Sequence, residues 1–536
     1  MALTERYRDF TVASALAHRA TTDPEHPFIV FRGETLTYGE MEGNAEALAA
    51  SLHGLGIETG DRIALVLPAW PEFVISLFAA AKIGAVVVPL NPRLTAPELQ
   101  YMLRHSEAVL AVTAETLQGV DYLQLFEDLL VQLPDLQHLV TVGDDDLWYD
   151  DRIFQFEDLL SAGMGRDYPT PVGTEGGSPA DELLAILYTS GTMGKPKGVG
   201  VTHANLLWAA ASTADVVGLV EGDKVIGMSS LFHVFGMGPG LMGTLLAGAT
   251  LILQDEFDGG ATLDLVEQHG VTVQFGTPTL FITELGEQAS CPRNLKTLRV
   301  GVAAGAPVGE KLVRETEAAL CPTLLVAYSL TETSSTVAIT TREDSGEKRR
   351  FTVGRPLDGT EVRVLERDGA ALPNESVGEI AVRGPGVMKG YHRQPQETSA
   401  SMTDDGFLLT GDLGIIDEEG YIHLVGRRKE VIIRSGFNVY PREVEDRIRA
   451  HPGVNETAVV GVPDEVLGEA ICACIVPVEG AIVTGSELQD WCRVTLADYK
   501  VPDLVRFFDG FPLTGTGKIR RVELVRMVQA QHSTKR

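Results

Sequence analysis

Apolar runs of strand length alternate with amphipathic segments of helix length along the first third of this 536-residue chain. Residues 62–67 and 85–90 predict buried strands, and residues 71–83 and 96–106 predict the helices that follow them. Strands that alternate with helices favour a parallel sheet covered by helices on both faces. Because the chain is too long for a single domain core, we expect an α/β fold with more than one domain.

Composition restricts the class of partner. The chain has 44 Lys and Arg against 74 Asp and Glu, a net charge of -30, so nucleic acid and anionic membrane are not expected partners. This acidity fits either a high-salt habitat or ordinary compositional bias. The five cysteines lack metal-ligand spacing, which indicates structural thiols in a reducing compartment. A polar N-terminus and the absence of a membrane-length apolar run predict a cytoplasmic protein without a transmembrane segment.

The most informative stretch follows the apolar run at residues 183–187. Glycines there let a large anion approach the main chain, while hydroxyls and lysines supply donors and charge. The spacing of a Walker A loop is absent, and the alternative is a surface turn that is merely rich in glycine. The sequence therefore predicts a phosphate-binding loop. Its candidate residues are Thr189, Ser190, Gly191, Thr192, Gly194 and Lys195.

A second strand pattern, at residues 324–330, ends close to three side chains that suit a nucleotide. Tyr328 offers a face for stacking, Thr331 a donor for a phosphate, and Glu332 a carboxylate for Mg²⁺. Glu332 could instead be a favourable charge at a helix N-terminus. The small residues Gly305, Ala306 and Pro307 could let a flat ring lie against the backbone, or could simply pack closely.

Three further residues have both a functional and a structural interpretation. Asp412 lies between glycines, where it could hold a ribose diol or shape a turn. His233, among aromatic residues, could border a substrate pocket or be an ordinary core histidine. Lys518, in a glycine-bearing loop, could be catalytic or merely a solvated surface lysine.

The motif Thr-Ser-Gly-Thr-x-Gly-x-Pro-Lys-Gly resembles the phosphate loop of the adenylate-forming superfamily, which holds acyl-CoA synthetases, luciferases and peptide-synthetase adenylation domains. The resemblance extends over nearly the whole chain, through counterparts at residues 328–332, 411–412, 426–427 and 515–518. It implies a large N-terminal domain (residues 1–428) of parallel-sheet α/β subdomains plus a small β subdomain. A small mobile α+β C-terminal domain (residues 429–536) would follow, with Lys429 at the hinge.

The resemblance also implies a reaction in two halves. A carboxylate attacks the α-phosphate of ATP to give an acyl-adenylate and pyrophosphate, and the thiol of CoA then displaces AMP. It assigns catalysis to Lys518, Glu332, Thr189 and His233, and Mg²⁺ to Glu332 and Thr189. In the ATP site it implies, the phosphate loop would hold the β- and γ-phosphates, and Thr331, Glu332 and Lys518 would act at the α-phosphate and Mg²⁺. Adenine would stack on Tyr328 and be bordered by Gly305, Ala306 and Pro307. The ribose would be held by Asp412 and Arg427. The face presented to CoA would comprise Arg434, Ser435, Gly436 and Phe437.

The acid itself is predicted from the segment around His233. The side chains that flank His233 are apolar and include no obvious partner for a second carboxylate or an amino group, so we expect an apolar acid, first of all a fatty acid. The pocket candidates are Phe232, His233, Val234, Phe235, Met237 and Gly238. An aryl acid such as a coumarate-like one, a separate carrier protein as acceptor, a homodimer, and a nucleotide sensor without chemistry all stay open. A fused carrier domain is not expected.

Overall fold

The computed structural model describes residues 2–143, 151–169, 178–189, 196–227, 230–366, 369–435, 437–464, 466–513 and 519–533. The chain divides into two compact units. The first comprises residues 1–308, 312–361 and 383–406, and the second comprises residues 309–311, 362–382 and 407–536.

The first unit contains an eight-stranded sheet whose middle strands run parallel. In spatial order its strands are β21 (Gly390–Tyr391), β11 (Lys197–Thr202), β10 (Leu183–Thr189), β4 (Val86–Pro89), β3 (Arg62–Val66), β5 (Ala108–Ala114), β8 (His138–Val142) and β9 (Ile153–Gln155). Strand β11 pairs antiparallel with both β10 and β21. The predicted parallel sheet is therefore present, with antiparallel strands added at one edge. A separate two-stranded hairpin joins β6 (Thr116–Leu117) and β7 (Val120–Asp121).

A nine-stranded sheet forms the other half of this unit. Its order is β18 (Arg355–Pro356), β17 (Ser335–Ile339), β16 (Leu324–Leu330), β15 (Val300–Ala303), β14 (Val273–Gly276), β12 (Lys224–Ile226), β13 (Thr250–Ile252), β1 (Pro27–Phe31) and β2 (Glu34–Thr37). Strands β1 and β2 form the hairpin that the sequence predicts around Arg32 and Gly33. Both sheets are mixed, and the predicted α/β class is confirmed.

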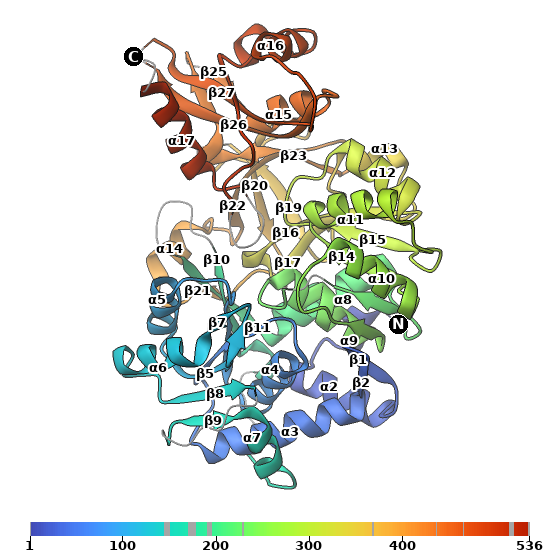
Figure 1. Cartoon of the computed structure of the whole chain (residues 1–536), viewed down its shortest axis with the longest axis vertical. Helices are drawn as coiled ribbons and strands as arrows, with labels where there is room; N and C mark the ends of the chain where they lie inside the picture. The colour runs from blue at the N-terminus through green and yellow to red at the C-terminus, as the bar shows by residue number, and fades with distance from the viewer. Residues whose placement is uncertain are drawn as a thin grey trace. The chain divides into compact units, whose positions relative to one another are not determined.

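Helices cover these sheets. They are α1 (Leu3–Arg6), α2 (Val12–Thr22), α3 (Tyr38–Gly54), α4 (Pro71–Ile83), α5 (Ala96–Ser106), α6 (Tyr122–Gln132), α7 (Phe156–Gly163), α8 (His203–Val217), α9 (Gly243–Ala247), α10 (Gly259–His269), α11 (Pro278–Ser290), α12 (Glu310–Ala319), α13 (Gly346–Phe351) and α14 (Pro395–Ala400). Helix α8 packs against β11 of one sheet and β17 of the other, so it lies where the two sheets meet (Figure 1).

Local sequence signals explain where several of these helices begin and end. Helix α3 starts with a capping box, because Thr37 Oγ1 accepts from the Glu40 amide and Glu40 Oε2 accepts from the Thr37 amide. Helix α4 starts with Pro71 in its first turn and ends at Gly84, whose φ of 73° suits glycine. Residues 73–83 of α4 are all buried, so this apolar segment is a core helix.

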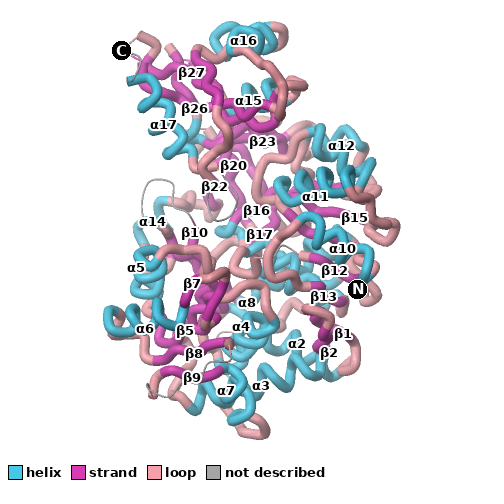
Figure 2. Tube along the Cα trace, viewed as in Figure 1, coloured by secondary structure: helices cyan, strands magenta, loops and turns pink. Residues whose placement is uncertain are grey.

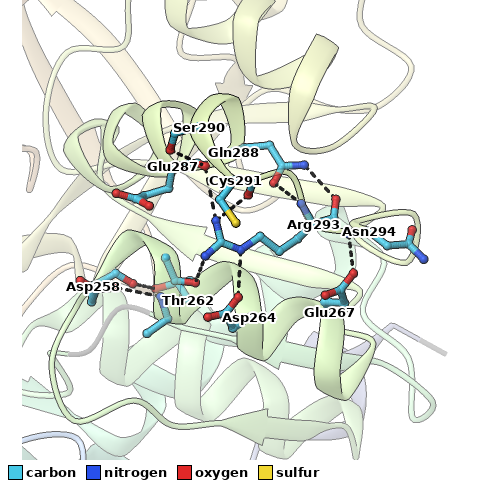
Figure 3. A network of polar contacts seen from close by, with 12 residues as sticks. Asp258, Thr262, Asp264, Glu267, Glu287, Gln288, Ser290, Cys291, Arg293 and Asn294 are labelled. Atoms are coloured by element: carbon cyan, nitrogen blue, oxygen red, sulfur yellow. Dashed lines mark hydrogen bonds and ion pairs between the residues drawn. The ribbon is translucent and has the colours of Figure 1, made fainter.

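Arg293 holds the end of α11 against α10. Its guanidinium binds Asp264 at 2.9 Å and donates to the Cys291 carbonyl at 2.6 Å, while Gln288 bonds both main-chain groups of Arg293 (Figure 3). The Asn294 amide adds a bond to Glu267. This polar network fixes α11, whose first turn follows strand β14 through Thr277.

The second unit contains two antiparallel-rich sheets. One holds β19 (Glu361–Leu365), β20 (Gly378–Arg383), β22 (Leu408–Ile416) and β23 (Ile422–Arg427), which is the predicted small β subdomain. The other holds β24 (Ile432–Arg434), β25 (Phe437–Val439), β26 (Val454–Asp464), β27 (Gly468–Pro477) and β28 (Leu504–Phe507). Helices α15 (Pro441–Arg449), α16 (Gly485–Arg493) and α17 (Arg521–Ser533) flank the second sheet (Figure 2). Pro441 stands in the first turn of α15, as predicted.

No helix in the described ranges combines the length and the apolar character that crossing a membrane requires.

Candidate functional site

The predicted phosphate loop connects two paired strands. Strands β10 and β11 form an antiparallel ladder that reaches Thr189 and Lys197, so the two strand ends that flank residues 190–195 lie side by side. Tyr101 Oη supports the start of β11 by donating to the Pro196 carbonyl at 3.2 Å. Thr189 ends β10 and is half-buried. The other predicted loop residues, Ser190, Gly191, Thr192, Gly194 and Lys195, lie outside the described residues.

One residue before Thr189, the side chain of Tyr188 connects β10 to helix α5 through hydrogen bonds. Tyr188 Oη lies 2.8 Å from His105 Nδ1 and donates to the Met102 carbonyl at 3.1 Å. The His105 ring in turn meets His392 edge-on at 5.7 Å, and the His392 amide donates to the Gly198 carbonyl. Burial lowers the pKa of both histidines, so both rings are uncharged near neutral pH.

Glu332 lies in a short 3-10 helix, Thr331–Thr333, that directly follows β16 and packs against β11. Glu332 Oε1 accepts a 3.0 Å hydrogen bond from Tyr391 Oη, and the Glu332 carbonyl accepts from the Met388 amide. Thr331 and Glu332 are half-buried. The structure therefore brings the predicted Mg²⁺ carboxylate next to the strand that leaves the phosphate loop.

Tyr391 is a contact of this site that sequence patterns missed. It belongs to the two-residue strand β21, where it pairs with Val199 of β11. The ammonium of Lys197 lies 4.7 Å from the centre of the Tyr391 ring and also forms an ion pair with Glu397 of α14. A two-residue strand leaves no periodic signal, because periodicity needs a longer run.

The residues assigned to adenine lie at the ends of adjacent strands. Strands β15 and β16 are parallel neighbours; Gly305 to Pro307 follow β15, and Tyr328 lies near the end of β16. Gly305 has a φ of 84°, a conformation that favours glycine. Ala306 and Pro307 are exposed, whereas Tyr328 is only 5% exposed and pairs with Ala338 of β17.

The predicted acyl segment comprises residues 232–238. Its second half belongs to a π-helix, Gly236–Met242, that contains Pro239. Such widened turns interrupt regular helices and occur often at functional sites. Gly236 is required there, because a Cβ would lie 2.4 Å from the Ser230 carbonyl oxygen. The Phe232 and His233 rings pack 4.8 Å apart and are half-buried. The other four pocket candidates, Val234, Phe235, Met237 and Gly238, are buried.

The contacts of Phe235 identify the face of the nine-stranded sheet on which the acyl segment packs. The Phe235 ring meets Phe275 of β14 edge-on at 5.7 Å, so the π-helix packs on the β14 face that carries Phe275. Since side chains alternate along a strand, Gln274 points to the opposite face, where it bonds Glu284 of α11. The predicted acyl segment and the buried Gln274–Glu284 pair therefore lie on opposite faces of one strand.

In the second unit, the structure brings together the two residues assigned to ribose. Asp412 of β22 pairs directly with Arg427 of β23, and Arg427 Nε lies 3.1 Å from Asp412 Oδ1. Asp412 is 7% exposed and occupies a strand, so the alternative of a turn aspartate is wrong. Gly411 beside it has a φ of 73°.

The predicted hinge and CoA face also belong to the second unit. Lys429 lies in the 3-10 helix Arg428–Glu430 that follows β23. The Arg434 guanidinium makes a two-pronged ion pair with Asp503, with bonds of 2.7 and 2.9 Å. Phe437 is 54% exposed and stacks on Tyr499 at 4.7 Å. Ser435 has a φ of 48°, and Gly436 and Lys518 lie outside the described residues.

Comparison with known proteins gives a family. The AMP-binding enzyme family matches residues 16–392, and the AMP-binding enzyme C-terminal domain matches residues 443–518. The chain is similar to feruloyl-CoA synthase from Amycolatopsis sp, with 37% identity over 510 residues that cover 95% of this chain and 97% of that protein. It is 32% identical to a long-chain-fatty-acid–CoA ligase from Bacillus subtilis (strain 168), over 98% of this chain and 96% of that protein.

Comparison with solved structures also finds adenylate-forming enzymes. The crystal structure of ATP-bound MatB from Rhodopseudomonas palustris matches with a TM-score of 0.86 and 30% identity, and the match covers 97% of this chain and 99% of that chain. Two independent comparisons, of sequence and of structure, thus agree with the motifs along nearly the whole length. The chain belongs to the AMP-binding enzyme family.

Proposed function

We propose that the protein is an AMP-forming acyl-CoA synthetase that uses ATP, Mg²⁺ and CoA. An oxygen of the acid carboxylate attacks the α-phosphate of ATP, pyrophosphate leaves, and an acyl-adenylate forms. The sulfur of CoA then attacks the acyl carbon, and AMP leaves. The main support is the placement of Glu332 beside β11, because a carboxylate next to a phosphate loop suits a magnesium nucleotide.

Each predicted site residue has a separate role in the formation of the acyl-adenylate. Two anions must meet, so their charge must be screened by Mg²⁺ and by cations. Thr189 and the loop at residues 190–195 hold the β- and γ-phosphates, and Thr331 contacts the α-phosphate. Glu332 and Thr189 supply oxygen ligands of the kind that Mg²⁺ prefers. Lys518 neutralises the charge that develops between carboxylate and α-phosphate.

The remaining residues bind the rest of the nucleotide and the acid. Tyr328, with Gly305, Ala306 and Pro307, borders adenine, and the Asp412–Arg427 pair holds the ribose. His233 and its apolar neighbours border the acyl group. In the second step a small domain of residues 429–536 turns about Lys429 relative to residues 1–428, which withdraws Lys518 and presents residues 434–437 to CoA. Such closures take microseconds to milliseconds.

The acid in this proposal is apolar. A fatty acid fits the apolar segment at residues 231–242, most of which is buried. An aryl acid is the second candidate, because one similar relative is a feruloyl-CoA synthase. Pyrophosphate release across acids from acetate to palmitate, with benzoate, coumarate and malonate, distinguishes the two. Fastest release with palmitate or another long chain supports the fatty acid, and fastest release with coumarate replaces it by an aryl acid.

The proposal also includes a cellular location and an oligomeric state for the protein. We place the protein in the cytoplasm, in line with its five cysteines, none of which forms a disulfide in the structure and four of which are buried. A homodimer is tested by light scattering of the purified chain. A mass near the chain's 57.7 kDa contradicts the dimer.

Asp412→Asn is expected to raise the KM for ATP and to change kcat less. The substitution removes a charge that bonds both Arg427 and, in this proposal, the ribose, and a hydrogen bond to a charged group contributes about 1.5–3 kcal/mol. The KM should therefore rise by about tenfold or more. Asp417→Asn is the matched control, because Asp417, in the connection between β22 and β23, also contacts a side chain of this hairpin, His423, but has no assigned ligand. An unchanged KM in Asp412→Asn contradicts the ribose assignment.

A further inference from the structure

Glu332 is held from two directions by one short segment, residues 388–391. Its carbonyl accepts from the Met388 amide at 2.9 Å, and its carboxylate oxygen Oε1 accepts from Tyr391 Oη at 3.0 Å. A carboxylate whose main chain and one oxygen are both fixed has a defined orientation. In that orientation no residue in the described ranges bonds the second oxygen, Oε2, which can therefore take another ligand.

The same segment is joined to the strand that leaves the phosphate loop. Val199 pairs with Tyr391 and Gly200 with Gly390, so β21 is the edge strand beside β11. The Lys197 ammonium, two residues before Val199, lies 4.7 Å from the Tyr391 ring centre. Tyr391 therefore contacts the loop strand with its backbone and ring, and Glu332 with its hydroxyl.

We propose that Tyr391 is a positioning residue that orients the Glu332 carboxylate for Mg²⁺ and holds it beside strand β11. This rests on the proposed function, since it takes Glu332 as the carboxylate for the metal. A group that hydrogen-bonds a metal ligand fixes the ligand's orientation, and its loss typically costs ten- to a hundredfold in metal affinity.

Helix α14 holds Tyr391 in place as a donor. An ionised carboxylate only accepts hydrogen bonds, so the Tyr391 hydroxyl is the donor in its bond to Glu332. The Tyr391 amide bonds Thr398 Oγ1 at 2.9 Å, and Glu397 pairs with Lys197. Helix α14 thus holds the backbone of Tyr391, while the ring of Tyr391 contacts Lys197 and its hydroxyl contacts Glu332.

Tyr391→Phe removes the hydroxyl and keeps the ring over which Lys197 lies, so the fold should be preserved. Calorimetric titration with ATP, without any acid, is the test, at a series of Mg²⁺ concentrations and in EDTA. We expect the Mg²⁺ concentration for half-maximal ATP binding to rise by about tenfold, with binding in EDTA unchanged. The melting temperature should stay close to that of the native chain.

Tyr101→Phe is the matched control, because its hydroxyl bonds the Pro196 carbonyl at the same strand without contacting Glu332. An unchanged Mg²⁺ requirement in Tyr391→Phe overturns the proposal. Equal losses with and without Mg²⁺, or the same shift in Tyr101→Phe, also overturn it, because they indicate a general loosening of β11. If no acid is ever adenylated, the proposed function fails, yet this titration still decides the role of Tyr391.

Discussion

Lys518→Ala is expected to lower the rate of acyl-adenylate formation by about a hundred- to a thousandfold, the usual effect of removing one group that stabilises developing charge. ATP binding should be largely kept, because the phosphate loop, Glu332 and the Asp412–Arg427 pair are unchanged. The loss should appear in kcat for acid-dependent pyrophosphate release. ATP affinity is measured separately by equilibrium titration, so the two effects can be compared directly.

Two controls sharpen this experiment. Lys296→Ala removes an exposed lysine from the turn before β15, and it should leave both measurements unchanged. Preformed acyl-adenylate offered to Lys518→Ala with CoA should still give acyl-CoA, because the proposed mechanism withdraws Lys518 before the second step. If adenylate formation survives intact in Lys518→Ala, the lysine is the solvated surface residue that the sequence also allows.

Glu284→Gln is expected to make the protein more stable at neutral and alkaline pH. Glu284 is fully buried in α11; its Oε1 accepts from Gln274 Nε2 at 2.6 Å, and its Oε2 has no partner in the described parts of the chain. Burial raises the pKa of Glu284 from 4.5 to about 8, so the native carboxyl is neutral at pH 7. Unfolding releases the proton above pH 4.5, and each pH unit then costs about 1.4 kcal/mol of stability.

The raised pKa of Glu284 determines the direction in which stability changes with pH. The stability contributed by the protonated carboxyl is fully present below pH 4.5 and is lost as the pH rises through about 8. The difference in unfolding free energy between Glu284→Gln and the native chain should therefore grow by about 5 kcal/mol over this range, in favour of the variant. Burial raises the pKa of the neighbouring Cys321 to about 12, so its thiol does not titrate there.

Urea unfolding at several pH values measures this difference. Glu287→Gln, one turn along the same helix and partly exposed, is the control and should show no such growth. A difference between Glu284→Gln and the native chain that stays constant from pH 4.5 to 8 contradicts a neutral buried carboxyl at this position.

Much of the fold could be predicted because its elements carry local signals. The run at residues 71–83 begins with proline and ends before glycine, and α4 has those bounds. The hairpin at Arg32 and Gly33 and the start of α15 at Pro441 are likewise set by turn and capping chemistry. The family was predicted from motifs and is confirmed.

What the sequence did not predict depends on contacts between distant segments. Tyr391 reaches Glu332 only because β21 pairs with β11, and a two-residue strand has no pattern of its own. The resemblance assigned Asp412 and Arg427 to the same ribose, but only the β22–β23 register shows that the two side chains pair with each other. The π-helix after Phe235 also left no signal, because its glycines and proline fit an ordinary turn equally well.

A single-turnover experiment tests the central claim most directly. Enzyme in excess is mixed with ATP, Mg²⁺ and the preferred acid, without CoA, and the products are quantified before and after CoA is added. The account predicts equal amounts of pyrophosphate and enzyme-bound acyl-adenylate, followed by acyl-CoA and AMP once CoA is present. Formation of ADP and phosphate, or an acyl-adenylate that CoA cannot discharge, would contradict an AMP-forming acyl-CoA synthetase.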